Sequence, residues 1–398
     1  MELSNNVAFE IFSWLPAKSI CKLKLTCESF SEFSKESTFK TKQAHNLFGR
    51  DDTCFFIQPE QTRQGFEKRV ELHSLPKEQQ SSGIPKNVLT FLSNSACVLA
   101  SSNGLVLCHT INNNDKLELF VCNPITKSWS FIPTPESLQI NYSNFANINL
   151  MLDCSRDSPD DFLVFLFENT MDYYFSPKTS YICKVYHGKE GVWKTMERRF
   201  FPGGRNMNFD MPVFHNGAVH IISDSGDYFG KSSPFYKPYI MSYNLEDGTS
   251  TMLELPREAT KDCPAVWCNM GIFNWGKVTS YSNHRSICLV KLSKSAFTIW
   301  ILKDYESASW KKVFKVRVKD LGLKEEKDVD VERVGFTVMN GGDLLVFSTE
   351  NKIYSCRLDD ERFKMVEEIC KHNCGPNPRF ISYSDTLRSC GINAQTMP

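Results

Sequence analysis

The sequence predicts a mainly β protein, in which a β-propeller of about six or seven blades follows a small segment of three helices. Three observations lead to this prediction. Apolar residues in the first 48 positions have helical spacing, whereas from about residue 54 onward short apolar runs alternate with turn residues. A loose repeat of roughly 50 to 60 residues then recurs along the β region, close to the length of a propeller blade.

The first helix is predicted from one apolar face. Val7, Ile11 and Leu15 recur every four residues, so they lie on the same side of a helix. Ser4 is suited to cap its start, and Pro16 ends it because proline cannot continue a helix.

Two more short helices are expected before the β region. A second begins near Ser19, with Ile20 and Leu23 on its inward face, and Phe30 lies in the third. So small a segment cannot build much core alone, and its many apolar positions predict a partner. The alternative is that these residues form the internal core of a helical cap on the propeller.

The β region is recognised by short runs rich in Val, Ile, Phe and Tyr, bounded by Gly, Asn, Asp, Ser and Pro. Large residues that follow a turn mark the repeat, and they are 64, 59, 58 and 53 residues apart: Trp129, Trp193, Met252, Trp310 and Phe363. We interpret the three tryptophans as structural anchors of the blades. A large β-sandwich with accidental spacing is the alternative to a propeller.

Composition limits the possible functions. Lys+Arg and Asp+Glu both number 46, and a neutral chain lacks the overall charge of a nucleic-acid binder. No apolar run approaches the roughly 20 residues that span a bilayer, so no membrane is expected as a partner. The start has no basic n-region, so the 15 cysteines are read as reduced thiols in the cytoplasm or nucleus.

Residues 3 to 45 resemble an F-box of the plant type. The matching residues follow the family's spacing of apolar positions, then Leu-Pro-x-Lys-Ser, then Cys-x-Ser: Val7, Glu10, Ile11, Leu15, Pro16, Lys18, Ser19, Ile20, Leu23, Cys27 and Ser29. The sequence departs from the family at Ser4, where a proline is usual, at Asn6, where an acid is usual, and at Phe30, where tryptophan is usual.

The remainder resembles the F-box-associated, kelch-like domain of the same plant proteins. Three segments look like signatures of that domain, in the family's order: residues 101–108, 123–129 and 214–220. The resemblance implies an F-box at residues 1–48 and a kelch-like β-propeller at 50–390.

The resemblance implies the substrate-recognition subunit of an SCF-type ubiquitin ligase, with no catalytic residue and no cofactor of its own. The F-box would bind a Skp-type adaptor, and through it a cullin and a RING subunit, while the propeller binds a protein substrate. The expected adaptor contacts are Val7, Ile11, Leu15, Pro16, Ile20, Leu23 and Phe30.

Aromatic residues set among polar residues or proline are the candidates for substrate binding, because loops at one face of a propeller carry such contacts. They are Tyr173, Tyr174, Tyr228, Phe229 and Tyr236.

Other functions have less support in the sequence. Cys370, His372 and Cys374 are closely spaced metal-ligand types, but no second pair with matching spacing completes a zinc site. His215 and His220 flank a predicted Asn-Gly hairpin turn and are interpreted as sheet residues. Two alternatives stay open: a protein- or glycan-binding module that acts outside a ligase, and an enzyme on a propeller scaffold, which would need copper or another cofactor.

Overall fold

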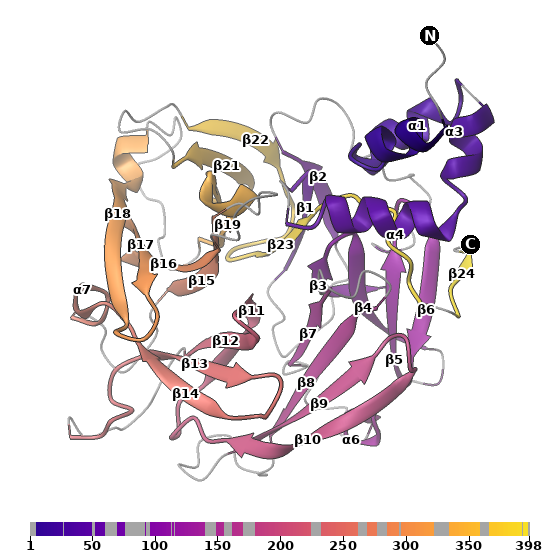
Figure 1. Cartoon of the computed structure of the whole chain (residues 1–398). Helices are drawn as coiled ribbons and strands as arrows, with labels where there is room; N and C mark the ends of the chain where they lie inside the picture. The colour runs from indigo at the N-terminus through magenta and orange to yellow at the C-terminus, as the bar shows by residue number, and fades with distance from the viewer. Residues whose placement is uncertain are drawn as a thin grey trace.

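The computed structural model describes residues 5–26, 28–49, 52–59, 70–75, 92, 96–112, 114, 116–139, 149–154, 161–169, 180–223, 232–261, 269–276, 285–293, 296–321, 334–358, 366–391 and 393–396. Helices occupy the N-terminal part of the described chain, and the rest is mainly strands (Figure 1).

Among the described residues, four helices precede the first strand: α1 (Asn5–Phe12), α2 (Ala17–Leu23), α3 (Glu28–Phe33) and α4 (Ser37–Asn46). The sequence predicted three, so α4 is the helix that it missed. Only Phe39, Gln43 and Ala44 are buried in α4, and one of them is polar. Its apolar periodicity is therefore weak, although it is the longest of the four.

The described strands form six antiparallel sheets, which are the six blades of a β-propeller. Blade 1 holds β3 (Cys97–Ser102), β4 (Leu105–Ile111), β5 (Leu117–Asn123) and β6 (Ser128–Ile132), with β24 (Gln395–Thr396) at its edge. Blade 2 holds β7 (Leu150–Asp153), β8 (Leu163–Asn169), β9 (Tyr181–His187) and β10 (Val192–Phe200). Blade 3 holds β11 (Met207–His215), β12 (Ala218–Ser223), β13 (Tyr239–Asn244) and β14 (Ser250–Glu254).

The other three blades complete the ring. Blade 4 holds β15 (Met270–Trp275), β16 (Ser286–Ser293), β17 (Ala296–Asp304) and β18 (Ser309–Arg317). Blade 5 holds β19 (Phe336–Met339), β20 (Leu344–Ser348), β21 (Lys352–Arg357) and β22 (Glu367–Lys371). Blade 6 holds β23 (Arg379–Tyr383), β1 (Cys54–Gln58) and β2 (Glu71–Ser74). Short helical turns lie between strands: α6 (Glu136–Gln139), α7 (Arg257–Thr260), η2 (Val318–Leu321) and η4 (Asn340–Gly342).

The ring is closed by strands from opposite ends of the propeller sequence. In blade 6, β23 is innermost and pairs antiparallel with β1, from Cys54 opposite Tyr383 to Gln58 opposite Arg379. The innermost strands β3, β7, β11, β15, β19 and β23 each contact the next around the ring. The prediction of a mainly β propeller is thus confirmed, with six blades, and the kelch-like detail stays a prediction.

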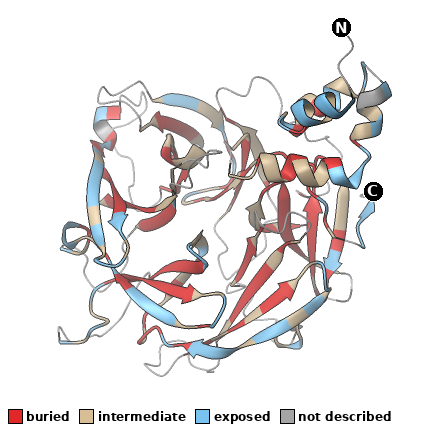
Figure 2. Ribbon diagram, viewed as in Figure 1, coloured by how far each residue is buried: buried red, intermediate tan, exposed pale blue. Residues whose placement is uncertain are grey.

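Burial follows the position of a strand within its blade. Strands in the middle of the blades, such as β12 and β16, are mostly red in Figure 2, whereas the outermost strands β10, β14 and β18 consist mostly of exposed residues. Tryptophans on these outer strands link neighbouring blades. The indole Nε1 of Trp193 donates to the carbonyl of Pro133 at 2.6 Å, and that of Trp310 donates to the carbonyl of Glu254 at 2.9 Å.

The N-terminal helices are attached to blades 6 and 1. Ala17, Ile20 and Phe39 belong to one buried cluster together with Phe56 and Val106, which lie on β1 and β4. Because the core is continuous from helix to propeller, the helices are packed onto the β-domain and not tethered by a free linker.

Candidate functional site

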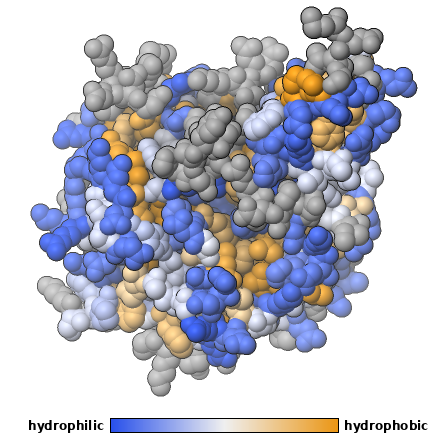
Figure 3. Space-filling model, in the orientation of Figure 1, coloured by the Kyte–Doolittle hydropathy of each residue, from blue (hydrophilic) through white to orange (hydrophobic). Residues whose placement is uncertain are grey.

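The N-terminal helices present an exposed apolar surface. Val7, Ile11, Trp14 and Leu25 are 49%, 50%, 41% and 89% exposed. These four make up nearly half of the nine exposed large hydrophobic residues in the described chain, although they fall within 19 consecutive positions. In Figure 3 a hydrophobic group lies on these helices at the upper right. A concentration of this kind marks an interaction surface.

Helix α1 is apolar on two faces, which explains why this surface stays exposed. Val7 and Ile11 lie one turn apart on the outer face. On the inner face, the ring of Phe9 meets the rings of Phe33 and Phe39 edge-on, with centroids 5.8 and 5.2 Å apart. One face is thus used inside the protein, and the other is about half exposed.

The other predicted adaptor contacts lie near this surface to different degrees. Pro16 is exposed, and Leu15 and Leu23 are half-buried. Phe30 lies within α3, but its side chain is outside the described residues. Trp14 was not predicted, and its spacing of three residues from Ile11 was the available signal.

Ile20 lies on the inward face that the sequence predicted for the second helix, and its contact with an adaptor stays a prediction. Its side chain is 3% exposed and packs into the cluster that joins the helices to blades 6 and 1. Helical spacing could not distinguish the two faces of α2, because both carry apolar residues. In this structure Ile20 is an attachment residue of the helices, in line with the alternative of an internal core.

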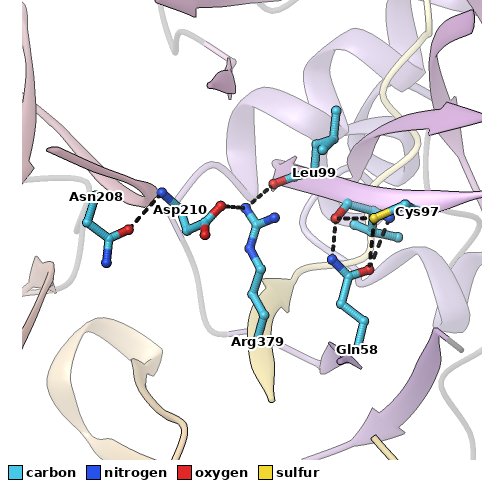
Figure 4. Close-up of polar contacts among 7 residues, drawn as sticks. Gln58, Cys97, Leu99, Asn208, Asp210 and Arg379 are labelled. Carbon is cyan, nitrogen blue, oxygen red and sulfur yellow. Dashed lines mark hydrogen bonds and ion pairs between the residues drawn. The ribbon is translucent and has the colours of Figure 1, made fainter. Parts of the chain in front are cut away.

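The propeller carries a polar contact that crosses its centre (Figure 4). The guanidinium of Arg379, on β23 of blade 6, lies 3.1 Å from the carboxylate of Asp210, on β11 of blade 3. The same Nη2 donates to the carbonyl of Leu99, on β3 of blade 1, at 2.6 Å. The Asp210 side chain is 61% exposed, whereas that of Arg379 is 12% exposed. One cation therefore connects three innermost strands.

Gln58 strengthens the same region. It pairs with Arg379 across β1 and β23, and it is only 2% exposed. Its amide donates to the carbonyl of Val98 at 2.7 Å and accepts from the backbone N–H of Val98 at 3.2 Å. The oxygen and the nitrogen of the buried amide thus both join blade 6 to blade 1.

Of the predicted substrate-binding residues, Tyr173, Tyr174, Tyr228 and Phe229 lie outside the described residues. Tyr236 is described and half-buried, in the turn before β13. Nη1 of the buried Arg205 donates to the carbonyls of Phe235 and Tyr236 at 3.2 and 3.3 Å. This clamp fixes the backbone of the turn while part of the tyrosine side chain stays accessible.

The turn of Tyr236 lies at the opposite end of the strands from the helices. Its neighbour β13 is parallel to β11 and begins beside the start of β11, because both pair antiparallel with β12. The helices instead reach the far ends of innermost strands. Asn103, just after β3, donates to the carbonyl of Ala44 at 3.1 Å, and the backbone N–H of Thr53 donates to the carbonyl of Tyr383 at 2.9 Å.

The histidines that were considered as a dyad belong to the sheet. His220 is fully buried, its Nδ1 donates to the carbonyl of Val213 at 3.2 Å, and its Nε2 lies 2.8 Å from the Tyr305 hydroxyl. Burial lowers the pKa of His220 to about 4. The hydroxyl of Tyr305 also lies 2.7 Å from the hydroxyl of Ser242. This neutral, buried chain of hydrogen bonds joins blades 3 and 4.

Ligand types for a metal do not converge in the described chain. No group of three or more His, Cys, Asp or Glu side chains there is arranged to hold an ion. Both ring nitrogens of His372 are engaged, one with the carbonyl of Thr349 at 3.1 Å and one with the backbone N–H of Cys374 at 3.2 Å. Within the same residues, every helix is too short or too polar to cross a membrane.

Comparison with known proteins agrees with this arrangement. Residues 1–42 match the F-box domain, and residues 65–390 match the F-box associated beta propeller domain. The chain is 22% identical to the F-box protein At5g49610 of Arabidopsis thaliana over 322 residues, which cover 79% of each protein. It is 23% identical to the F-box protein At5g07610 of Arabidopsis thaliana over 267 residues, 65% of this chain and 58% of that one.

A solved structure of the Aleuria aurantia lectin aligns with 82% of this chain and 98% of its own, at 11% identity and a TM-score of 0.43. The family match spans most of the chain and coincides with the propeller, and the F-box match coincides with the helices. The chain therefore belongs to the plant F-box proteins with an F-box-associated β-propeller domain.

Proposed function

We propose that this protein is the substrate-recognition subunit of an SCF-type ubiquitin ligase, which leads to ubiquitination and degradation of a target protein. The observation that carries the proposal is the exposed apolar surface of the F-box helices, formed by Val7, Ile11, Trp14 and Leu25. A Skp-type adaptor that covers this surface would supply the core that so short a helical segment lacks. The adaptor in turn would connect the chain to a cullin and a RING subunit.

The chain itself needs no catalytic group in this role. A propeller that holds a substrate near the ubiquitin-conjugating enzyme raises the effective concentration of the acceptor lysine, and the rate rises with it. Packing of the F-box helices on blades 6 and 1 supports this role, because a fixed attachment keeps the two binding surfaces at a set distance. We propose the cytoplasm or nucleus as the place of action, which suits an assembly of this kind.

The proposed substrate surface is the propeller face away from the F-box attachment. Tyr236 belongs to it, and Tyr173, Tyr174, Tyr228 and Phe229 stay proposed contacts from the sequence. The half-exposed carboxylate of Asp210, tied to Arg379, offers a charged group in the same propeller for a polar part of the substrate.

Co-purification with a Skp-type adaptor tests the proposal, with two valines as a matched pair. Val7 is 49% exposed on α1, and Val192 is 45% exposed on the outer strand β10 of the propeller. An aspartate at either position costs little in the free protein, because both sites face solvent. Val7→Asp is expected to weaken adaptor binding at least 10-fold, since it buries a charge in the interface, whereas Val192→Asp binds like the wild type.

Failure of the wild-type chain to bind the adaptor would overturn the ligase role. The propeller would then act as a protein- or glycan-binding module outside a ligase, which is the alternative that the departures at Ser4 and Phe30 leave open. Equal loss of binding in Val7→Asp and Val192→Asp would instead show that the helices are not the adaptor surface.

A further inference from the structure

After β23 the chain continues past the F-box helices to the edge of blade 1. Residues 384–391, here called the C-terminal strap, run from the innermost strand of blade 6 past α4 and lead to β24 at the edge of blade 1 (Figure 1). The strap has no regular secondary structure, yet Asp385, Thr386, Leu387 and Arg388 are only 4%, 0%, 1% and 1% exposed. An irregular segment so deeply buried must have its polar groups satisfied by specific partners.

The strap completes the second helix of the F-box. Helix α2 starts after Pro16, which has no side-chain oxygen to cap it, and no side-chain capping bond is formed by that residue. Instead, the carboxylate of Asp385 accepts from the backbone N–H of Lys18 at 3.1 Å. This amide, in the first turn of the helix, is one of those that an N-cap side chain normally satisfies. Asp385 thus caps, from 367 residues away, a helix that carries predicted adaptor contacts.

A buried glutamine on α4 ties the strap to the helix connection. The side-chain oxygen of Gln43 accepts from the backbone N–H of Leu387 at 2.9 Å, and its amide donates to the carbonyl of Leu15 at 3.1 Å. Gln43 is fully buried, so loss of either partner would leave a polar group without water or protein to replace it.

The other side of the strap is held by blade 1. The amide of the buried Asn123 donates to the carbonyls of Thr386 and Arg388 at 3.0 and 2.8 Å, and the Thr386 hydroxyl donates to the carbonyl of Asn103 at 2.7 Å. The approach is so close that a Cβ on Gly104 would lie 2.2 Å from the Thr386 hydroxyl oxygen. The strap is therefore clamped between the F-box helices and the β3–β4 turn.

We infer that the C-terminal strap is a positioning element, in which Asp385 and Thr386 fix the F-box helices on the propeller and complete the start of α2. That the strap holds the helices rests on the hydrogen bonds of Asp385, Thr386 and Leu387 described above. Its consequence for ubiquitin transfer rests on the proposed function, because only a ligase needs a set distance between adaptor and substrate surfaces. Linkage also requires the reverse effect: a ligand that stabilises α2 stabilises the seated strap by the same factor.

Amide hydrogen exchange of the free, full-length protein tests the structural part without any adaptor. In Asp385→Ala, exchange across residues 17–23 is expected to be about 5-fold faster, the loss that a missing N-cap causes, while exchange in blade 4 stays unchanged. Asp385→Asn keeps an acceptor oxygen and is expected to restore most of the protection. Unchanged exchange in α2 of Asp385→Ala would overturn the inference.

Two glycines give a second, matched test. Gly104 and Gly217 both follow an asparagine in a hairpin turn between the first two strands of a blade, with φ of +85° and +71°. Alanine strains the backbone at both, but only at Gly104 does the new Cβ meet the strap, since nothing lies within 4 Å at Gly217. Gly104→Ala is expected to speed exchange at Leu387 and in α2, and Gly217→Ala is not. Equal behaviour of the two variants would refute the clamping role of Thr386.

A reconstituted ligase separates the inference from the proposed function. The assay measures which lysines of the propeller the ligase ubiquitinates on this protein itself. In the wild type, with its fixed strap, ubiquitin is expected on a restricted set of lysines. In Asp385→Ala it is expected on a wider set. If the adaptor does not bind the wild type, the proposed function fails while the exchange result stands. If the adaptor binds both proteins and their acceptor lysines are the same, the positioning role in transfer is refuted.

Discussion

Acidification should weaken the fold through His220. The buried imidazole hydrogen-bonds to Val213 and Tyr305, and burial lowers its pKa from the usual 6.5 to about 4. The unfolded chain therefore binds a proton at a higher pH than the folded one does, and stability falls as pH drops below 6.5. Between pH 7.5 and 5 this group alone costs about 2 kcal/mol, from the two pKa values and the 1.36 kcal/mol that corresponds to one pKa unit.

Asp153 changes the stability with pH in the opposite direction, and its contribution must be separated from that of His220. Burial raises the pKa of Asp153 to about 6, so this carboxyl stabilises the folded state as pH falls, by an amount of similar order. Comparison of the wild type with His220→Gln removes Asp153 from the difference, because glutamine does not titrate and both proteins contain the same aspartate.

The assay is thermal unfolding of the two proteins at pH 7.5 and pH 5. For a domain of the size of this propeller, about 2 kcal/mol corresponds to a shift in Tm of roughly 3 °C. His220→Gln is expected to be the less stable protein at pH 7.5 and to lose about 3 °C less than the wild type on acidification. If Tm falls by the same amount in both proteins between pH 7.5 and pH 5, then His220 is not held neutral by burial, and the reasoning is refuted.

Two further predictions concern contacts between blades. Arg379→Met removes the charged hydrogen bond to Leu99 and is expected to lower the unfolding free energy by about 2 kcal/mol, whereas Asp210→Asn, which affects only the half-exposed ion pair, costs about 0.5 kcal/mol. Equal losses in chemical denaturation would place the stabilisation in the ion pair. Trp310→Phe removes the bond to the Glu254 carbonyl and is expected to cost about 1 kcal/mol, and an unchanged Tm would show that this bond does not stabilise the contact between blades 4 and 3.

Local patterns in the sequence were enough for the class of fold. Helical spacing of Val7 and Ile11 predicted α1, and the repeated tryptophans predicted the blades, because each pattern arises from neighbours along one helix or one hairpin. The Asn-Gly pair at 216 and 217 predicted a hairpin turn, and both residues adopt the positive φ that such a turn requires, 49° and 71°. Trp193 and Trp310 were interpreted as structural anchors, and they join neighbouring blades by hydrogen bonds.

The surfaces of the F-box helices could be predicted only in part. The sequence identified which residues are apolar, and Val7 and Ile11 are about half exposed, while their contact with an adaptor stays a prediction. It could not say that Ile20 faces the propeller, because burial of one helix face depends on which domain packs against it. Helix α4 was missed since its buried face includes the polar Gln43, whose partners lie on other segments.

What the sequence by itself determined was therefore the local elements, their order and their repeat. The tertiary structure alone decided the number of blades, the closure of β1 on β23, the contact of Arg379 with Asp210, and the capping of α2 by Asp385. The last three of these join residues more than 150 positions apart. No periodicity within one element can encode such a pair, because its formation depends on the path of the whole chain and on the burial that the closed ring imposes.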